Sequence, residues 1–222
     1  SFKSSGSCVR AADFDKDGDL DLFVGGRLFP HQYPMSVSSY LLQNDGTGKF
    51  SIANPDVAPG FDNLGMVSDA LFADVDNDGW TDLMLAGEFM PLTIFKNIEG
   101  KFQLNKNNGL NQQTGFWNSL AAGDFDQDGD LDFVAGNLGL NSQINASKEN
   151  PFRIYYGDFD KNGSMDVIPS MWRKSISGEK KEFPFFTRTD IEKQIIKVKK
   201  AYKKHEDFGK ATLDQIIGLF PN

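Results

Sequence analysis

One nine-residue motif occurs four times in this 222-residue chain and constrains its fold more than any other feature. The motif reads Asp-x-Asp-x-Asp-Gly-x-x-Asp, with Asn in place of the third acid in the last copy. The copies, named loops 1 to 4, are Asp13–Asp21, Asp74–Asp82, Asp124–Asp132 and Asp158–Asp166. Oxygen ligands at positions 1, 3 and 5, followed by a glycine that can adopt positive φ, suit a tight turn around a hard cation. We therefore predict four ion-binding loops.

The spacing of the oxygen atoms favours calcium as the bound ion. We expect side chains at positions 1, 3 and 5, the backbone carbonyl at position 7 and the carboxylate at position 9 to surround it. An EF-hand would close with Glu at position 12, where this chain has Val24, Leu85, Ala135 and Pro169, so these loops are not EF-hands. The predicted metal-binding residues are Asp13, Asp15, Asp17, Asp19 and Asp21 in loop 1, Asp74, Asp76, Asp78, Trp80 and Asp82 in loop 2, Asp124, Asp126, Asp128, Asp130 and Asp132 in loop 3, and Asp158, Asp160, Asn162, Ser164 and Asp166 in loop 4.

An alternative is that the four loops are acidic turns without metal, since Asp, Asn and Gly are ordinary turn residues. Three or four carboxylates in one turn repel one another unless a cation neutralises them, which favours metal binding. The formal net charge is −8, and four divalent ions would bring it to about zero, so the acidity requires no further partner. Because Asn162 supplies a neutral oxygen, we expect loop 4 to bind calcium most weakly.

Short apolar segments flank the loops and predict β-strands. The segments 22–26, 83–87 and 133–136 follow loops 1 to 3 and end in small residues, as buried strands do. Apolar segments at 40–44 and 92–97, each followed by a Gly-containing turn, predict hairpins. The loops recur at an irregular interval of about 50 residues, the length of a four-stranded propeller blade. We predict a mainly β fold, a β-propeller sector of about four blades.

Two regions depart from this repeat. Residues 137–150 leave too little room for an outer hairpin, so the outer strands of the third blade are either missing or supplied from elsewhere. The segment Thr189–Glu192 resembles a capping box, and the apolar period that follows predicts a helix through about residue 205 and a shorter one from Thr212. We therefore divide the chain into propeller blades over residues 1–188 and a helical insertion or cap over residues 189–222.

The repeated motif, with the apolar strand and glycine that follow it, resembles the FG-GAP/VCBS repeats of integrin α-type β-propellers over most of residues 8–186. Residues 115–124 and 136–142 resemble more narrowly the bacterial proteins similar to cartilage acidic protein, which carry VCBS repeats before an ASPIC/UnbV domain. The resemblance implies a propeller with calcium in loops on one face, an extracytoplasmic location and an adhesion or binding role. It implies no catalytic residue.

We accordingly expect a calcium-stabilised extracellular module that binds a protein or glycan partner and is not an enzyme. The connection Arg27–Met35 is the candidate ligand surface, although packing against a neighbouring blade explains its aromatic residues equally well. The alternative function is a propeller-type carbohydrate-active lyase or hydrolase. His31 and His205 accompany no nucleophile motif, and we expect Cys8 to be a buried structural thiol.

Charge and hydropathy argue against nucleic acid as a partner and against a membrane span. The lysines of residues 193–204 predict a solvated helix face, and the net charge of −8 opposes nucleic acid. No run of about 18 apolar residues predicts a membrane span. Weak structural calcium sites fill most readily outside the cytosol, so we expect an extracellular, periplasmic or bacterial cell-surface location. Ser1–Ser4 shows neither an initiator Met nor a signal pattern, and we expect a longer parent chain to supply the remaining blades.

Overall fold

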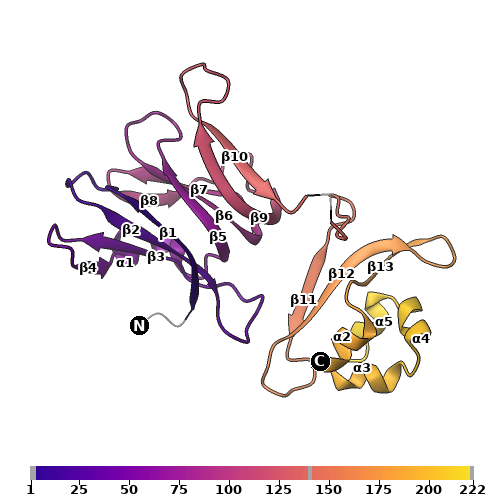
Figure 1. Ribbon diagram of the computed structural model, residues 1–222. Helices are drawn as coiled ribbons and strands as arrows, with labels where there is room; N and C mark the ends of the chain where they lie inside the picture. The colour runs from indigo at the N-terminus through magenta and orange to yellow at the C-terminus, as the bar shows by residue number, and fades with distance from the viewer. Residues whose placement is uncertain (1–3, 140–141, 221–222) are drawn as a thin grey trace. The chain divides into compact units, whose positions relative to one another are not determined.

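The computed structural model describes residues 4–139 and 142–220. This part of the chain is mainly β, with three antiparallel sheets followed by short helices (Figure 1). It divides into two compact units, residues 4–30 with 35–138 and residues 31–34 with 139–220, which are described separately. Residues 1–3, 140–141 and 221–222 lie outside the described residues. The prediction of a longer chain drew on residues 1–3, and the closer family resemblance drew in part on residues 140–141.

The first sheet is a four-stranded antiparallel meander, as the blade prediction requires. Its strands, adjacent in chain order, are β1 (Ser5–Ala12), β2 (Asp21–Leu28), β3 (Tyr40–Asn44) and β4 (Phe50–Ile52). Loop 1 joins β1 to β2, and β3 with β4 forms the predicted outer hairpin. A short helix, α1 (Asn54–Val57), and a 3-10 helix, η1 (Pro59–Phe61), then lead to the second repeat.

The second sheet repeats this meander and extends it. Its strands are β5 (Met66–Ala73), β6 (Asp82–Pro91), β7 (Thr93–Ile98), β8 (Lys101–Leu104), β9 (Thr114–Gly123) and β10 (Asp132–Asn137). Loop 2 joins β5 to β6, and loop 3 joins β9 to β10. After a register shift beyond Glu88, the end of β6 pairs with the start of β9. The described residues between β10 and β11 contain no strand, so they supply no outer hairpin to the third repeat.

One aromatic cluster joins the first two repeats. Phe61 of η1 is fully buried, and its ring makes edge contacts with Phe23 of β2 and Phe95 of β7 at centroid distances of 5.6 and 4.9 Å. Phe14, at position 2 of loop 1, packs against Phe102 of β8 at 5.6 Å. Each such aromatic pair adds about 0.5–1.5 kcal/mol beyond area burial. Loop 1 is therefore anchored in a core that the second repeat shares.

The first strands of successive repeats lie beside one another. β1 contacts β5, and β5 contacts β9, although neither pair is hydrogen-bonded as sheet neighbours. Asp69 of β5 is nearly buried, and its carboxylate forms an ion pair with Arg10 of β1. Its other oxygen accepts the backbone N–H of Leu120 in β9 at 2.9 Å. One carboxylate therefore links three repeats.

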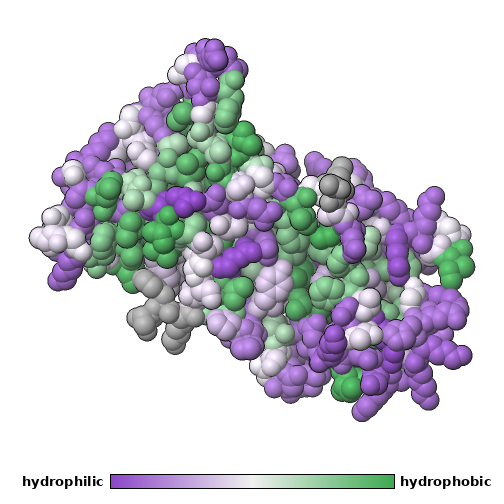
Figure 2. All heavy atoms as spheres, in the orientation of Figure 1, coloured by the Kyte–Doolittle hydropathy of each residue, from purple (hydrophilic) through white to green (hydrophobic). Residues whose placement is uncertain are grey.

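The third repeat exposes apolar side chains of the kind that the first repeat buries. Phe14 is 1% exposed, whereas Phe125, its counterpart in loop 3, is 59% exposed. Val134 is also exposed, whereas Phe23, its counterpart in the first repeat, is fully buried. Figure 2 shows apolar residues on the strands beneath the hydrophilic tip of the loop between β9 and β10. This side of the first unit is an apolar flank.

The second unit contains a three-stranded antiparallel sheet and four short helices. The strands are β11 (Arg153–Gly157), β12 (Asp166–Lys174) and β13 (Lys180–Pro184), and the helices are α2 (Arg188–Gln194), α3 (Ile196–Ala201), α4 (His205–Lys210) and α5 (Leu213–Ile217). Loop 4 joins β11 to β12. Ile191, Ile195 and Val198 are fully buried in one cluster with Ile168 of β12. None of the described helices has the length and apolar character needed to cross a membrane.

The start of the helical region differs from the sequence prediction. Thr187 is the N-cap, and its side chain accepts the backbone N–H of Asp190, whose carboxylate in turn accepts the backbone N–H of Thr187. The capping box predicted at Thr189–Glu192 is therefore wrong by two positions, because Thr189 lies inside α2.

The single helix predicted through about residue 205 is also wrong. The chain breaks at Ile195, where φ is −123° and ψ is 91°, and again at Tyr202. These breaks coincide with the burial of Ile191, Ile195 and Val198 in one cluster. The shorter helix predicted from Thr212 is confirmed as α5. The domain boundary at residue 188 stays a prediction, since the compact units divide after residue 138.

Replacing Asp69 should destabilise the first unit without involving metal. Asp69→Ala removes the Arg10 ion pair and leaves the N–H of Leu120 unpaired, which should cost about 2–4 kcal/mol of unfolding free energy. Chemical denaturation of metal-stripped protein measures this loss. Asp62→Ala, at an exposed position of the same unit, is the control and should change stability by less than about 0.5 kcal/mol. Equal effects of the two substitutions would contradict the assigned role.

Candidate metal centre

All four loops share one backbone conformation. Left-handed φ values occur at position 4 in Lys16 (63°), Asn77 (57°), Gln127 (65°) and Lys161 (62°), and at position 6 in Gly18 (97°), Gly79 (87°), Gly129 (97°) and Gly163 (86°). The glycines were expected from the sequence. The left-handed residue at position 4 was not, because only Asn77 belongs to a residue type that favours this region. Two left-handed residues bring the side chains at positions 1, 3 and 5 around one point.

Backbone N–H groups hold the side chains at positions 1 and 5 in the same way in each loop. The glycine at position 6 donates to the aspartate at position 1, with N···O distances of 3.1, 2.8, 3.2 and 2.9 Å in loops 1 to 4. The N–H at position 7 donates to the side-chain oxygen at position 5, at 3.1, 2.8, 3.1 and 2.7 Å. These bonds orient the oxygens before any ion binds.

The aspartate at position 9 fastens each loop to its sheet. It accepts the backbone N–H of position 2 at 3.4, 3.1, 2.9 and 3.0 Å in loops 1 to 4. In loops 1 and 2 its other oxygen accepts the backbone N–H of Asn44 or Asn97, at 2.9 and 2.7 Å. The nine-residue motif predicts only a ligand role for this residue. A carboxylate oxygen has two lone pairs, so the hydrogen bonds leave room for a metal contact.

Burial raises the pKa of three of the four carboxyl groups at position 9. Asp21, Asp82 and Asp166 are buried, and this burial raises the pKa of Asp21 to about 6 and the pKa of the other two in the same direction. Hydrogen bonds from backbone N–H groups oppose the shift at all three. In the absence of a cation, the folded protein therefore holds protons at these sites more tightly than the unfolded chain.

Each loop brings at least three acidic side chains within reach of one ion. One oxygen from each member lies within 4.8 Å of the others in the groups Asp13, Asp15 and Asp17; Asp74, Asp76 and Asp78; Asp124, Asp126 and Asp132; and Asp158, Asp160 and Asp166. Loops 1 and 2 thus gather positions 1, 3 and 5, whereas loops 3 and 4 gather positions 1, 3 and 9. The position 7 residues, Asp19, Trp80, Asp130 and Ser164, were predicted to contribute only a backbone carbonyl.

Loop 1 gives the direct test of whether an ion fits. Asp13 Oδ1, Asp15 Oδ1 and Asp19 Oδ1 are buried and accept no hydrogen bond. Desolvation and then the charges of Asp17, Asp15 and Asp13 raise the pKa of Asp19. Asp13 and Asp15 also belong to the group whose oxygens lie within 4.8 Å of one another, and desolvated anionic oxygens this close together are unfavourable unless a cation balances them. The residues therefore fit calcium, a hard cation that prefers oxygen ligands.

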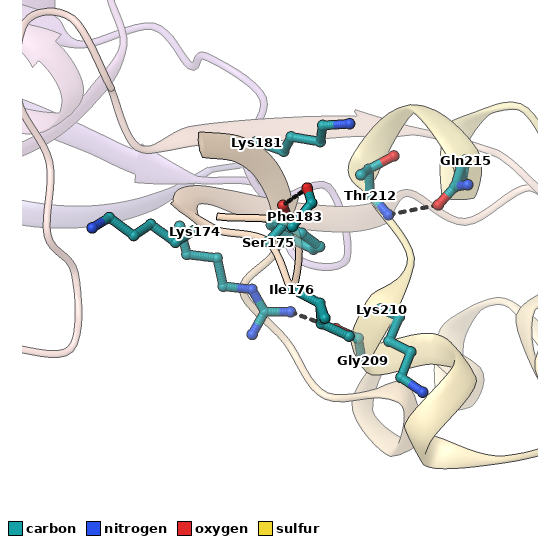
Figure 3. A pocket seen from close by; sticks show the side chains of 11 residues that line it. Lys174, Ser175, Ile176, Lys181, Phe183, Gly209, Lys210, Thr212 and Gln215 are labelled. Carbon is teal, nitrogen blue, oxygen red and sulfur yellow. Dashed lines mark hydrogen bonds between the residues drawn. The ribbon is translucent and has the colours of Figure 1, made fainter. Parts of the chain in front are cut away.

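The second unit contains a pocket of a different kind. It has a volume of about 390 Å³ and lies between the β12–β13 hairpin and helices α4 and α5 (Figure 3). Three of its cationic side chains have partners: Arg173 donates to the carbonyl of Gly209 at 3.0 Å, Lys181 pairs with Glu179, and Lys210 pairs with Glu206. Figure 3 shows Lys174 and Lys210 turned away from the other lining side chains. This pocket is a weaker candidate site than the loops.

The fold and the loops together define a tandem β-repeat protein, in which an aspartate-rich loop joins the first and second strands of each repeat. The sequence matches the model of the FG-GAP-like repeat over residues 13–85 and again over residues 74–135. These matches cover loops 1 to 3 and more than half of the chain, and the protein belongs to the FG-GAP-like repeat family. No curated protein matches the chain.

The buried carboxyl groups predict opposite pH responses with and without calcium. In metal-stripped protein, Asp21 has a folded-state pKa of about 6, above its unfolded value of about 3.9, so its contribution to stability falls as pH rises between these values. Calcium requires ionised carboxylates, so its stabilising effect should grow over the same range. Calorimetric melting from about pH 4 to about pH 7, with and without calcium, measures both. A calcium effect that shrinks as pH rises would contradict this account.

Proposed function

We propose that this protein is a calcium-stabilised binding or adhesion module, and that its repeats are a sector of a β-propeller that acts outside the cell on a protein or glycan partner. The observation that carries the calcium proposal is loop 1, where backbone N–H groups orient Asp13 and Asp17, and where one buried oxygen on each of Asp13, Asp15 and Asp19 accepts no hydrogen bond. Repetition of the same hydrogen bonds in loops 2 to 4 supports up to four calcium ions.

The propeller proposal is supported by contacts between repeats in the first unit. In a propeller the first strand of every blade lies near the central axis, and β1, β5 and β9 lie beside one another in this order. Lys16 Nζ of loop 1 lies 4.0 Å from the ring centroid of Trp80 in loop 2, as expected for calcium loops on one face. The described sheets are open, so the proposed ring requires further blades from a longer chain.

An enzymatic function is the alternative, and the described residues favour it less. The residues lining the pocket of Figure 3 include no carboxylate and no histidine, so they lack the acid pair that glycoside cleavage uses. His205, a candidate acid or base, already has a partner, because its Nε2 lies 3.2 Å from the Arg188 guanidinium. Burial raises the pKa of the Cys8 thiol, which disfavours a nucleophilic thiolate. Turnover of members of a glycan panel would restore the lyase or hydrolase proposal.

Three finer proposals rest on the sequence. The connection Arg27–Met35 remains the proposed partner surface. The closer relationship to bacterial proteins similar to cartilage acidic protein, with an ASPIC/UnbV domain in the parent chain, rests on residues 115–124 and 136–142. An extracellular, periplasmic or cell-surface location follows from the calcium requirement.

Nucleic acid is not proposed as a partner, and two of the helical lysines have contacts: Lys193 with Asp190 at 3.7 Å and Lys197 with the carbonyl of Leu219 at 2.6 Å.

Calcium should bind the folded chain and raise its melting temperature. Each site filled at about 100 times its dissociation constant adds about 2.7 kcal/mol, and this corresponds to several degrees. Scanning calorimetry with calcium and with excess chelator measures the shift, and elemental analysis counts the ions. Magnesium at the same concentration is the control and should stabilise less, because it demands a smaller octahedral site. An unchanged melting curve together with no bound calcium would refute the proposal.

The apolar flank of the third repeat should cause association if a neighbouring blade normally covers it. Phe125 and Val134 are the most exposed of its large apolar side chains. We expect light scattering to show concentration-dependent self-association, and Phe125→Ser with Val134→Ser to reduce it. A matched pair of substitutions at Ile176 and Ile196 of the second unit, both exposed, should leave it unchanged. A monomer at all concentrations would contradict the open-sector proposal.

A further inference from the structure

Loops 1 and 2 differ in one side chain that reaches them from the third strand of the repeat. Gln43 of β3 and Lys96 of β7 are equivalent, because each directly precedes the asparagine, Asn44 or Asn97, whose backbone N–H binds the position 9 aspartate of its own loop. The two repeats therefore place a neutral amide and a positively charged ammonium at the same point.

Both side chains bind the aspartate at position 3. Gln43 Nε2 donates to Asp15 Oδ2 at 2.6 Å. The ammonium of Lys96 forms an ion pair with Asp76 Oδ2. The Lys96 and Asp76 side chains are each 34% exposed, so the pair is only partly screened by solvent. Asp76 is also a member of the acidic group predicted to hold an ion in loop 2.

The acidic side chains of the two loops also differ in their exposure to solvent. Among the described residues, loop 1 contains three buried side-chain oxygens without a hydrogen-bond partner, on Asp13, Asp15 and Asp19, whereas Asp76 and Asp78 of loop 2 are exposed to solvent. The neutral donor of Gln43 leaves the negative charge of loop 1 unbalanced, whereas Lys96 already neutralises one of the carboxylates of loop 2.

We propose that Lys96 is a tethered counter-cation for loop 2, which stabilises this loop without calcium and lowers its affinity for calcium. The inference rests on the proposed calcium binding. An ion bound by Asp74, Asp76 and Asp78 would repel the ammonium on the same carboxylate, so binding must displace Lys96 or overcome the repulsion. Loop 1 carries no such penalty. The two neighbouring sites would then differ in calcium affinity although their motifs are alike.

Terbium titration of the full chain tests the affinity, because Trp80 occupies position 7 of loop 2 and can sensitise the luminescence of an ion bound there. We expect Lys96→Gln, which copies the first repeat, to tighten terbium binding at this site roughly ten-fold or more. The gain should shrink at high salt. Lys96→Arg keeps the charge and is the matched control, with an affinity near that of the parent. Trp80→Phe should remove the signal and so show that it arises from an ion bound near Trp80.

The reciprocal variant and the metal-free state complete the test. In calorimetric titration with calcium, Gln43→Lys should weaken the binding step that belongs to loop 1. In metal-stripped protein, Lys96→Gln should lower the melting temperature, whereas Lys96→Arg should not. Unchanged or weaker terbium binding by Lys96→Gln would overturn the inference. If neither parent nor variant bound terbium or calcium, the calcium proposal would fail, and the metal-free melting temperatures would still decide whether Lys96 neutralises the loop.

Discussion

Electrostatic repulsion within the aspartate-rich loops is the constraint on which the rest of the first unit depends. The chain holds like charges together through fixed backbone N–H groups, which bind the carboxylates at positions 1 and 9 and leave other oxygens converging. The same loops carry a core residue, since Phe14 directly follows Asp13 and lies in the aromatic cluster. Neutralising a loop therefore also secures the packing between two repeats.

The parts of the fold that local sequence encodes were predictable. Apolar segments flanking the loops predicted the strands, and Gly-containing turns predicted the hairpins β3–β4 and β7–β8. The four acidic groups were predictable because calcium-type loops place their ligands at fixed intervals within nine residues. The assignment to FG-GAP-like repeats rested on the same motif and is confirmed.

Features that depend on contacts distant in sequence were missed. From the sequence alone, Asp69 looks like an ordinary strand residue. Its role depends on the neighbouring strands β1 and β9, to which its carboxylate binds. The contacts of Gln43 and Lys96 with the loops were not predicted, because they depend on the pairing of β3 with β2 and of β7 with β6, which sets where each side chain lies relative to its loop. The break at Ile195 was missed because the apolar period runs through it without a glycine or proline, and tertiary packing overrode the helical pattern.

Contacts between the first two repeats also bear on how such a chain can grow by duplication. Asn97 of the second repeat donates to the carbonyl of Phe14 in loop 1 at 2.7 Å, and a Cβ on Gly100 would lie 3.3 Å from Cβ of Asp15. Loop 1 is thus completed by the repeat that follows it. The smallest heritable module is therefore a loop together with the hairpin of the next copy, and recombination within that span would separate a loop from the residues that shape it.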